Sequence, residues 1–233
     1  MFFAAAAAFA TIVGGGVPLL HRRLSERHLT LLVAFSGGVL LSTGLNHMIA
    51  ESFAETGRWA MLGVSMGFVI LYGYEKISMV HACREKECHI HSFGTGALIG
   101  MGFHSFLDGF AMAVSVLFEL KLGVVVITAV ILHRFPTGIS LAAILLSNDY
   151  TDNRAWRTLM VISGLALFGA GAGLLVPAAA TRFLGFTVGL SGGTFLYIST
   201  SDLLPLAHEN NQDYRVPFFF LAGFLGVLVV ALF

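Results

Sequence analysis

The most regular feature of the chain is a repeating pattern of long apolar runs separated by short polar segments. A helix needs about 20 apolar residues to cross a bilayer. Eight runs approach this length: 2–20, 30–54, 57–80, 93–118, 122–147, 155–178, 183–206 and 216–233. The pattern predicts an all-α integral membrane protein with eight transmembrane helices. It leaves no room for a separate soluble domain, so residues 1–233 are expected to form a single polytopic membrane domain.

The composition agrees with a membrane location. The sequence is 57% hydrophobic and 11% charged, with a mean hydropathy of +0.85, whereas soluble domains carry about 25% charged residues. A formal net charge of zero and the lack of a basic tract argue against a nucleic-acid partner. Two cysteines are too few for a disulfide framework. The first run has no Lys or Arg before its apolar core, so we interpret it as a membrane span and not as a signal peptide.

The basic residues predict how the spans are oriented, because cytoplasmic loops carry an excess of Lys and Arg. One set of loops holds nine of these residues and the opposite set holds three. The nine are Arg22, Arg23, Arg27, Lys76, Arg84, Lys86, Arg154, Arg157 and Arg215, and the three are Arg58, Lys121 and Arg182. This bias places the first, third, fifth and seventh loops in the cytoplasm and both termini on the extracytoplasmic side.

Small residues recur at four-residue intervals in several spans, as in the pairs Gly63/Gly67 and Gly169/Gly173. This spacing allows helix backbones to approach closely in a membrane. We expect compact helix packing, although glycines are also common in membrane helices in general.

Three spans carry polar residues four positions apart, which places each pair on one helix face. These pairs are His47/Glu51, His104/Asp108 and His133/Thr137. His104 and His133 lie about eleven residues into their spans, near the bilayer midplane, where ionisable groups are most costly. Imidazole nitrogens and a carboxylate on adjacent spans form a plausible partial shell for zinc, and also for iron or manganese. Each His taken alone has a simpler interpretation, a hydrogen bond to a neighbouring helix.

Two residues beside His133 add to the polarity of the fifth span. Pro136 cannot donate a hydrogen bond to the carbonyl of Leu132, so an acceptor is left free next to His133 unless the proline only kinks the helix. Arg134 keeps its charge at ordinary pH and needs an anion, and Asp108 on the neighbouring span is its best candidate. Asp202 in the seventh span either faces the same cavity or caps a helix break before Pro205.

These residues resemble the motifs of the ZIP (Zrt/Irt-like protein) family of metal transporters. HSFLDG is similar to the family's fourth-span motif H-N-x-x-[DE]-G, and HRFPTG to its fifth-span motif [HQ]-[END]-x-P-[HE]-[EG]. SGGTFLYISTSDLLP resembles the seventh span and NHMIAES the H-x-x-P-E region of the second. The resemblance implies eight spans with both termini outside, import of divalent metal toward the cytosol by alternating access, and metal ligation by His104, Asp108 and His133.

The chain departs from the motifs at positions that many family members use for a second metal. Ser105, Arg134 and Thr137 stand where the family has Asn, an acid, and His or Glu. We therefore expect a single-metal site in which Arg134 substitutes for the second cation. His47 and Glu51 are expected on the metal pathway, together with Ser105, Thr137 and Asp202. The replacement of the second-span proline by Ala50 is a departure from the family motif that argues against this role for His47 and Glu51.

The third loop, HACREKECHIH, is rich in soft and borderline metal ligands. It contains His81, Cys83, Cys88, His89 and His91. Loop 81–92 is expected either to capture metal that leaves the site on the cytosolic side or to be simply solvated.

The sequence thus predicts a metal importer with no catalytic activity and no organic cofactor. Zinc is the expected cargo, with iron, manganese and cadmium as alternatives that the ligand types do not exclude. The other expected partners are the lipid bilayer and, as one option, a second copy in a homodimer. There is no GxxxxGK[ST] motif, so ion gradients, membrane potential or cytosolic chelation would drive transport. Short loops suit a bacterial inner membrane, with an organelle membrane as the alternative. An intramembrane zinc hydrolase and a non-transporting metal sensor are the rival functions.

Overall fold

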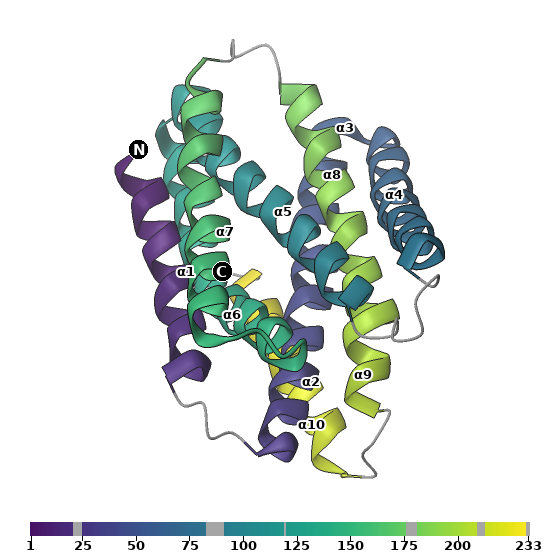
Figure 1. The fold of residues 1–233 in the computed structure, drawn as a ribbon. Helices are drawn as coiled ribbons and strands as arrows, with labels where there is room; N and C mark the ends of the chain where they lie inside the picture. Colours follow the sequence, from purple (N-terminus) through teal and green to yellow (C-terminus); the bar gives the residue numbers. More distant parts are fainter. Residues whose placement is uncertain (21–24, 83–90, 119, 176–180, 209–212, 232–233) are drawn as a thin grey trace.

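The computed structural model describes residues 1–20, 25–82, 91–118, 120–175, 181–208 and 213–231, and these form helices and short connections without a β-strand (Figure 1). Each predicted apolar run contains one helical rod. Six of the rods are single helices. The first, third, fourth and fifth rods are α1 (Phe2–Leu20), α4 (Trp59–Ala82), α5 (His91–Phe118) and α6 (Leu120–Ser147). Helices α7 (Asp152–Gly173) and α10 (Arg215–Ala231) are also uninterrupted.

The second and seventh rods each contain a π-helical segment. The second runs through α2 (Glu26–Ser42), η1 (Thr43–Ile49) and α3 (Ala50–Thr56), and the seventh through α8 (Thr181–Tyr197), η3 (Ile198–Leu203) and α9 (Leu204–His208). Short π segments within α-helices occur frequently at functional sites. The seventh rod stays helical through Pro205, so the predicted helix break before this proline is wrong. The π-helical segment η3 leads directly into α9, which contains the proline.

Five described stretches are long and apolar enough to cross a membrane: Phe2–Leu20, Arg27–Thr56, Thr95–Leu117, Val126–Ser147 and Asp152–Gly173. Arg215–Val229 is a shorter apolar helix. Together with α4 and α8–η3–α9 they make up the eight rods that lie side by side in Figure 1.

The rods form two bundles. Helices α1, α5, α6 and α7 pack against one another, and α2–η1–α3, α4, α8–η3–α9 and α10 form the second group. The bundles meet chiefly where α2 contacts α6 and where α8 contacts α5. In Figure 1, α1 and α7 lie at one side of the molecule and α4 at the other, with α5 crossing between them. The boundary between the bundles therefore runs along α5 and α6, which carry the polar motifs.

Glycines hold the helices of each bundle close together. A Cβ atom added at Gly67 on α4 would overlap the carbonyl oxygen of Leu190 on α8, and one added at Gly169 on α7 would overlap that of Phe106 on α5. The predicted close packing at the small-residue spacing is confirmed at these contacts. It places α5 firmly against α7, and this fixes the backbone that carries His104 and Asp108.

Candidate metal centre

The polar residues of the fourth and fifth spans come together inside the first bundle. His104 and Asp108 lie one turn apart on α5, and His133 projects from α6; all three are buried. One ligand atom from each of the three side chains lies within 4.8 Å of the others. Two imidazoles and a carboxylate at this separation are a donor set suited to a divalent metal ion such as zinc.

A single oxygen of Asp108 is the centre of the cluster. Its Oδ2 atom accepts a hydrogen bond from Nε2 of His133 at 3.0 Å and lies 3.3 Å from Nε2 of His104. Nε of Arg134 is 3.0 Å away from the same oxygen. The predicted ion pair between Arg134 and Asp108 is therefore present, although the Nε–H bond does not point along the line to the oxygen. This contact is mainly a charge interaction.

His104 is the least satisfied side chain of the cluster. It is 1% exposed, and neither ring nitrogen has a hydrogen-bond partner, since the approach of Nε2 to Asp108 lacks hydrogen-bonding geometry. Its ring packs against Phe195 of α8, with centroids 4.4 Å apart, and this holds its orientation. Buried polar atoms without partners are costly and rare. An imidazole held beside a carboxylate in this way has a lone pair available for a cation.

Arg134 is held in place by α5. Its Nη1 atom donates to Oγ of Ser105 at 3.0 Å, and Nη2 donates to the backbone carbonyl of Ser105 at 2.9 Å. Oγ of Ser105 in turn donates to the carbonyl oxygen of Ile162 on α7 at 2.6 Å. The guanidinium is fully enclosed, at 1% exposure. Its positive charge is thus fixed at the edge of the cluster by three helices of one bundle.

The two hydroxyl residues predicted to lie on the metal pathway already have hydrogen-bond partners. Ser105 serves as the anchor for Arg134, and Oγ1 of Thr137 donates to the carbonyl oxygen of His133 at 2.8 Å. Thr137 thereby satisfies a backbone group beside Pro136, and α6 continues through the proline without a break.

His47 and Glu51 lie next to the cluster and form its more open side. The His47 ring is 5.3 Å from the His133 ring, and Nδ1 of His47 is 3.9 Å from Oε2 of Glu51. Their side chains are 27% and 31% exposed, in contrast to the enclosed residues on α5 and α6. Both belong to the second bundle, so this pair faces the cluster across the bundle boundary.

Asp202 lies in a different polar cluster. Its charged neighbours are Glu75 and Lys76 on α4, and the hydroxyl of Tyr197 donates a short hydrogen bond to Oε2 of Glu75. Glu75 and Asp202 are each 5% exposed. The sequence interpretation missed Glu75, although an acidic residue inside the third apolar run was a visible signal. Tyr197 gave no such signal, because buried tyrosines are common in apolar helices.

The ligand-rich third loop falls largely outside the described residues. Cys83, Cys88 and His89 belong to a part of the chain that the structure does not describe. His81 and His91 lie in the last turn of α4 and at the start of α5, where the backbone is described but their side chains are not.

Residues 81–233 match the family model of the ZIP Zinc transporter. The chain belongs to this family. It is 29% identical to the zinc transporter zipt-7.2 of Caenorhabditis elegans over 140 residues, 56% of this chain and 30% of the relative. It is 26% identical to the zinc transporter ZIP9-B of Xenopus laevis over 188 residues, 73% and 62% of the two chains.

A third ZIP relative is the zinc transporter YKE4 of Saccharomyces cerevisiae, 25% identical over 221 residues, 81% of this chain and 64% of the relative. The matched part of the chain thus covers between 30% and 64% of the length of these three ZIP relatives. Family membership and the apolar helices together make this ZIP protein a multi-pass membrane protein.

Proposed function

We propose that this ZIP protein transports divalent metal ions, zinc foremost, through His104, Asp108 and His133. The observation that carries the proposal is the pair of unpartnered ring nitrogens of His104, buried beside a carboxylate and a second imidazole. A metal ion would supply the missing partner, and the ligands would in turn replace its hydration waters, which offsets the cost of dehydration. Iron, manganese and cadmium fit the same donor types and are alternative cargoes.

The route of the ion follows from the two sides of the cluster. The charge bias of the loops predicts that residues 57–58 lie on the extracytoplasmic side. With that orientation, the partly exposed His47 and Glu51 would lie on the outer side of the site. Phe195, which is fully buried, covers His104 from α8. We infer entry past His47 and Glu51 and release toward the cytosol, in a topology of eight spans with both termini outside.

Arg134 favours a single metal ion per site. Its guanidinium is fixed where the family motif has an acid, and a second cation there would meet a permanent positive charge. The charges of Asp108, Glu51, Arg134 and one divalent ion sum to plus one. That residual is far easier to hold in a low-dielectric region than a bare dication.

The two bundles offer a simple form of alternating access. His104, Asp108 and His133 all belong to the first bundle, whereas His47, Glu51 and Phe195 belong to the second. A displacement of one bundle against the other would move the loaded site away from His47 and Glu51 without pulling its three ligands apart. Ser105, Thr137 and Asp202, together with the ligands of loop 81–91, remain candidates for later steps of the pathway.

Transport alone, without catalysis or an organic cofactor, accounts for the site. The short loops agree with a bacterial inner membrane, and a homodimer is an alternative to a single chain. These assignments are part of the proposal.

The deciding experiment is metal uptake into sealed vesicles that contain the purified protein and an internal zinc-sensitive dye. Saturable uptake by the wild type that is lost in His104→Ala/Asp108→Ala supports transport. His208→Ala is a matched control, because this exposed imidazole lies outside the cluster and is hydrogen-bonded to the carbonyl of Leu204 in its own helix. Tight zinc binding without flux in the wild type would instead favour a sensor or a zinc hydrolase.

A further inference from the structure

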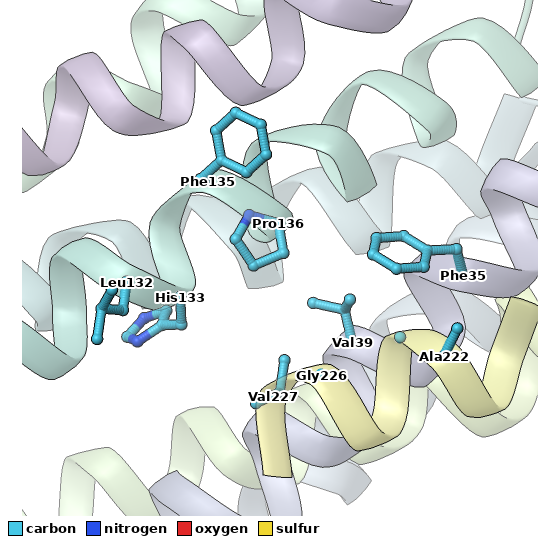
Figure 2. A pocket seen from close by; sticks show the side chains of 10 residues that line it. Phe35, Val39, Leu132, His133, Phe135, Pro136, Ala222, Gly226 and Val227 are labelled. Carbon is cyan, nitrogen blue, oxygen red and sulfur yellow. The ribbon is translucent and has the colours of Figure 1, made fainter. Parts of the chain in front are cut away.

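An apolar cavity lies beside the metal site, and His133 is part of its lining. It has a volume of about 270 Å³ and is enclosed by α6, α2 and α10 (Figure 2). The lining consists of Leu132, His133, Phe135 and Pro136 from α6, Phe35 and Val39 from α2, and Ala222, Gly223, Gly226 and Val227 from α10. His133 is its one ionisable lining residue.

The cavity crosses the boundary between the two bundles. One wall is α6 of the first bundle, and the other walls are α2 and α10 of the second. Leu132 and Phe135 beside it are 52% and 43% exposed, and Gly226 is exposed on α10, so the cavity opens at the outer surface of the helices. That surface faces lipid in a membrane protein.

The depth of the cavity restricts what can enter it. Gly226 lies eleven residues into α10, ~17 Å along the helix from Arg215 at ~1.5 Å per residue. The hydrocarbon core is about 30 Å thick, so this position is near its middle, beyond the reach of lipid headgroups. An engineered apolar cavity of roughly 150 Å³ stays dry and takes up apolar molecules, so an apolar occupant suits this mostly apolar lining better than water does.

We propose that this cavity binds the acyl chain of a membrane lipid, which completes the wall of the metal site behind His133. The lining offers dispersion contacts along its length and no polar group suited to a headgroup or a sterol hydroxyl other than His133 itself. An acyl chain wedged between α6 and α10 would fill the space between the two bundles.

Glycine positions allow the proposal to be tested with little damage to the fold. A Cβ atom at Gly226 meets no atom within 4 Å, so Gly226→Leu should extend into the cavity without displacing the backbone. Gly171 on α7 has equally open surroundings and lies in the other bundle, away from the cavity, so Gly171→Leu is the matched control. Ala222→Leu is a second filling variant one turn earlier on α10.

The experiment is photo-crosslinking in vesicles made with a phosphatidylcholine whose acyl chain carries a diazirine at its middle, followed by peptide mapping. We expect crosslinks concentrated at 132–136 and 222–227 and a loss of about tenfold in Gly226→Leu and Ala222→Leu, which corresponds to ~1.4 kcal/mol. Gly171→Leu should keep the wild-type pattern. Crosslinks spread evenly over the lipid-facing helices, or unchanged in both filling variants, would overturn the proposal, as would labelling by a photoreactive sterol alone.

The readout involves no metal, so it is independent of the transport proposal. It requires only that the chain lies in a membrane. A protein that binds the acyl chain but transports no zinc would support this proposal and contradict the transport proposal. A protein that transports zinc without binding the acyl chain would do the opposite.

Discussion

Nε of Arg134 and Nε2 of His133 both lie 3.0 Å from the same oxygen atom of Asp108. The carboxylate that would bind a metal ion is therefore already neutralised by a fixed charge when the site is empty. Because Arg134 and His133 share this oxygen, we expect Arg134 to affect both the stability of the fold and, under the proposed function, the number of ions that the site can hold.

The substitution Arg134→Glu is expected to raise the number of bound metal ions from one to two per chain. It restores an acidic residue at the position where the family motif has an acid. Metal content of the purified protein, measured by mass spectrometry after equilibration with zinc, checks this. One ion in both proteins would contradict the role of Arg134 as a substitute for the second cation.

Arg134→Ala should destabilise the protein without changing the stoichiometry. Removal of one partner from a buried ion pair costs about 3–5 kcal/mol, since the charge of Asp108 is left uncompensated. The melting temperature in detergent should fall strongly in the absence of metal and recover in part when zinc is added. Arg134→Lys keeps the charge but loses the paired contacts to Ser105. Its melting temperature should therefore lie between those of the wild type and Arg134→Ala.

His104→Leu is expected to separate stability from metal binding. The substitution removes two buried nitrogen atoms that lack partners, so the metal-free protein should gain about 1–3 kcal/mol in its free energy of unfolding. Zinc affinity, measured by isothermal titration calorimetry, should be lost. A destabilised metal-free variant would show that the nitrogens of His104 are satisfied in the folded protein by a group such as water.

Gly67→Leu should disrupt the contact between α4 and α8, because a side chain there would meet the carbonyl of Leu190. Gly73 lies on the same helix with nothing within 4 Å of an added Cβ atom, so Gly73→Leu is the matched control. We expect a large fall in melting temperature for the first variant and little change for the second. Equal melting temperatures would mean that these helices pack differently.

A surface ion pair joins the ends of α2 and α10 and gives a pH-dependent prediction. Hydrogen bonds from Arg27 and from the backbone N–H of Arg215 hold the pKa of the Asp213 carboxyl below its usual value. Its contribution to stability is therefore present above about pH 4, the usual aspartate range, and is lost as the pH falls through the lowered pKa.

The difference in melting temperature between wild type and Asp213→Asn should accordingly be constant from neutral pH down to about pH 4 and should shrink below it. It should also decrease in high salt, because Arg27 is exposed. A difference that grows on acidification would contradict this sign.

The sequence predicted the positions of the helical rods well, because hydrophobic length is a direct consequence of bilayer thickness. It also predicted that His104, Asp108 and His133 would approach one another and that Arg134 would pair with Asp108. In each case an ionisable side chain inside an apolar span had few polar groups within reach, and this limited the number of possible interaction partners.

Other features depend on three-dimensional packing and were not predictable from one sequence. The π segments η1 and η3 leave no composition signal, since residues of the same types form ordinary α-helix. Ser105 was expected on the metal pathway, but its hydroxyl lies between Arg134 and the carbonyl of Ile162, a residue 57 positions away. The grouping of Asp202 with Glu75 likewise depends on how α4 packs against the seventh rod.

The unpartnered imidazole of His104 has a consequence for how long the protein survives in a cell. A ligand that binds only the folded state stabilises it by about 2.7 kcal/mol at one hundred times its dissociation constant. The metal-free molecule is then the weaker fold and opens more often to membrane proteases. If the site binds zinc as proposed, the abundance of the protein would fall as zinc becomes scarce and rise with supply, through mass action alone and without a dedicated sensor.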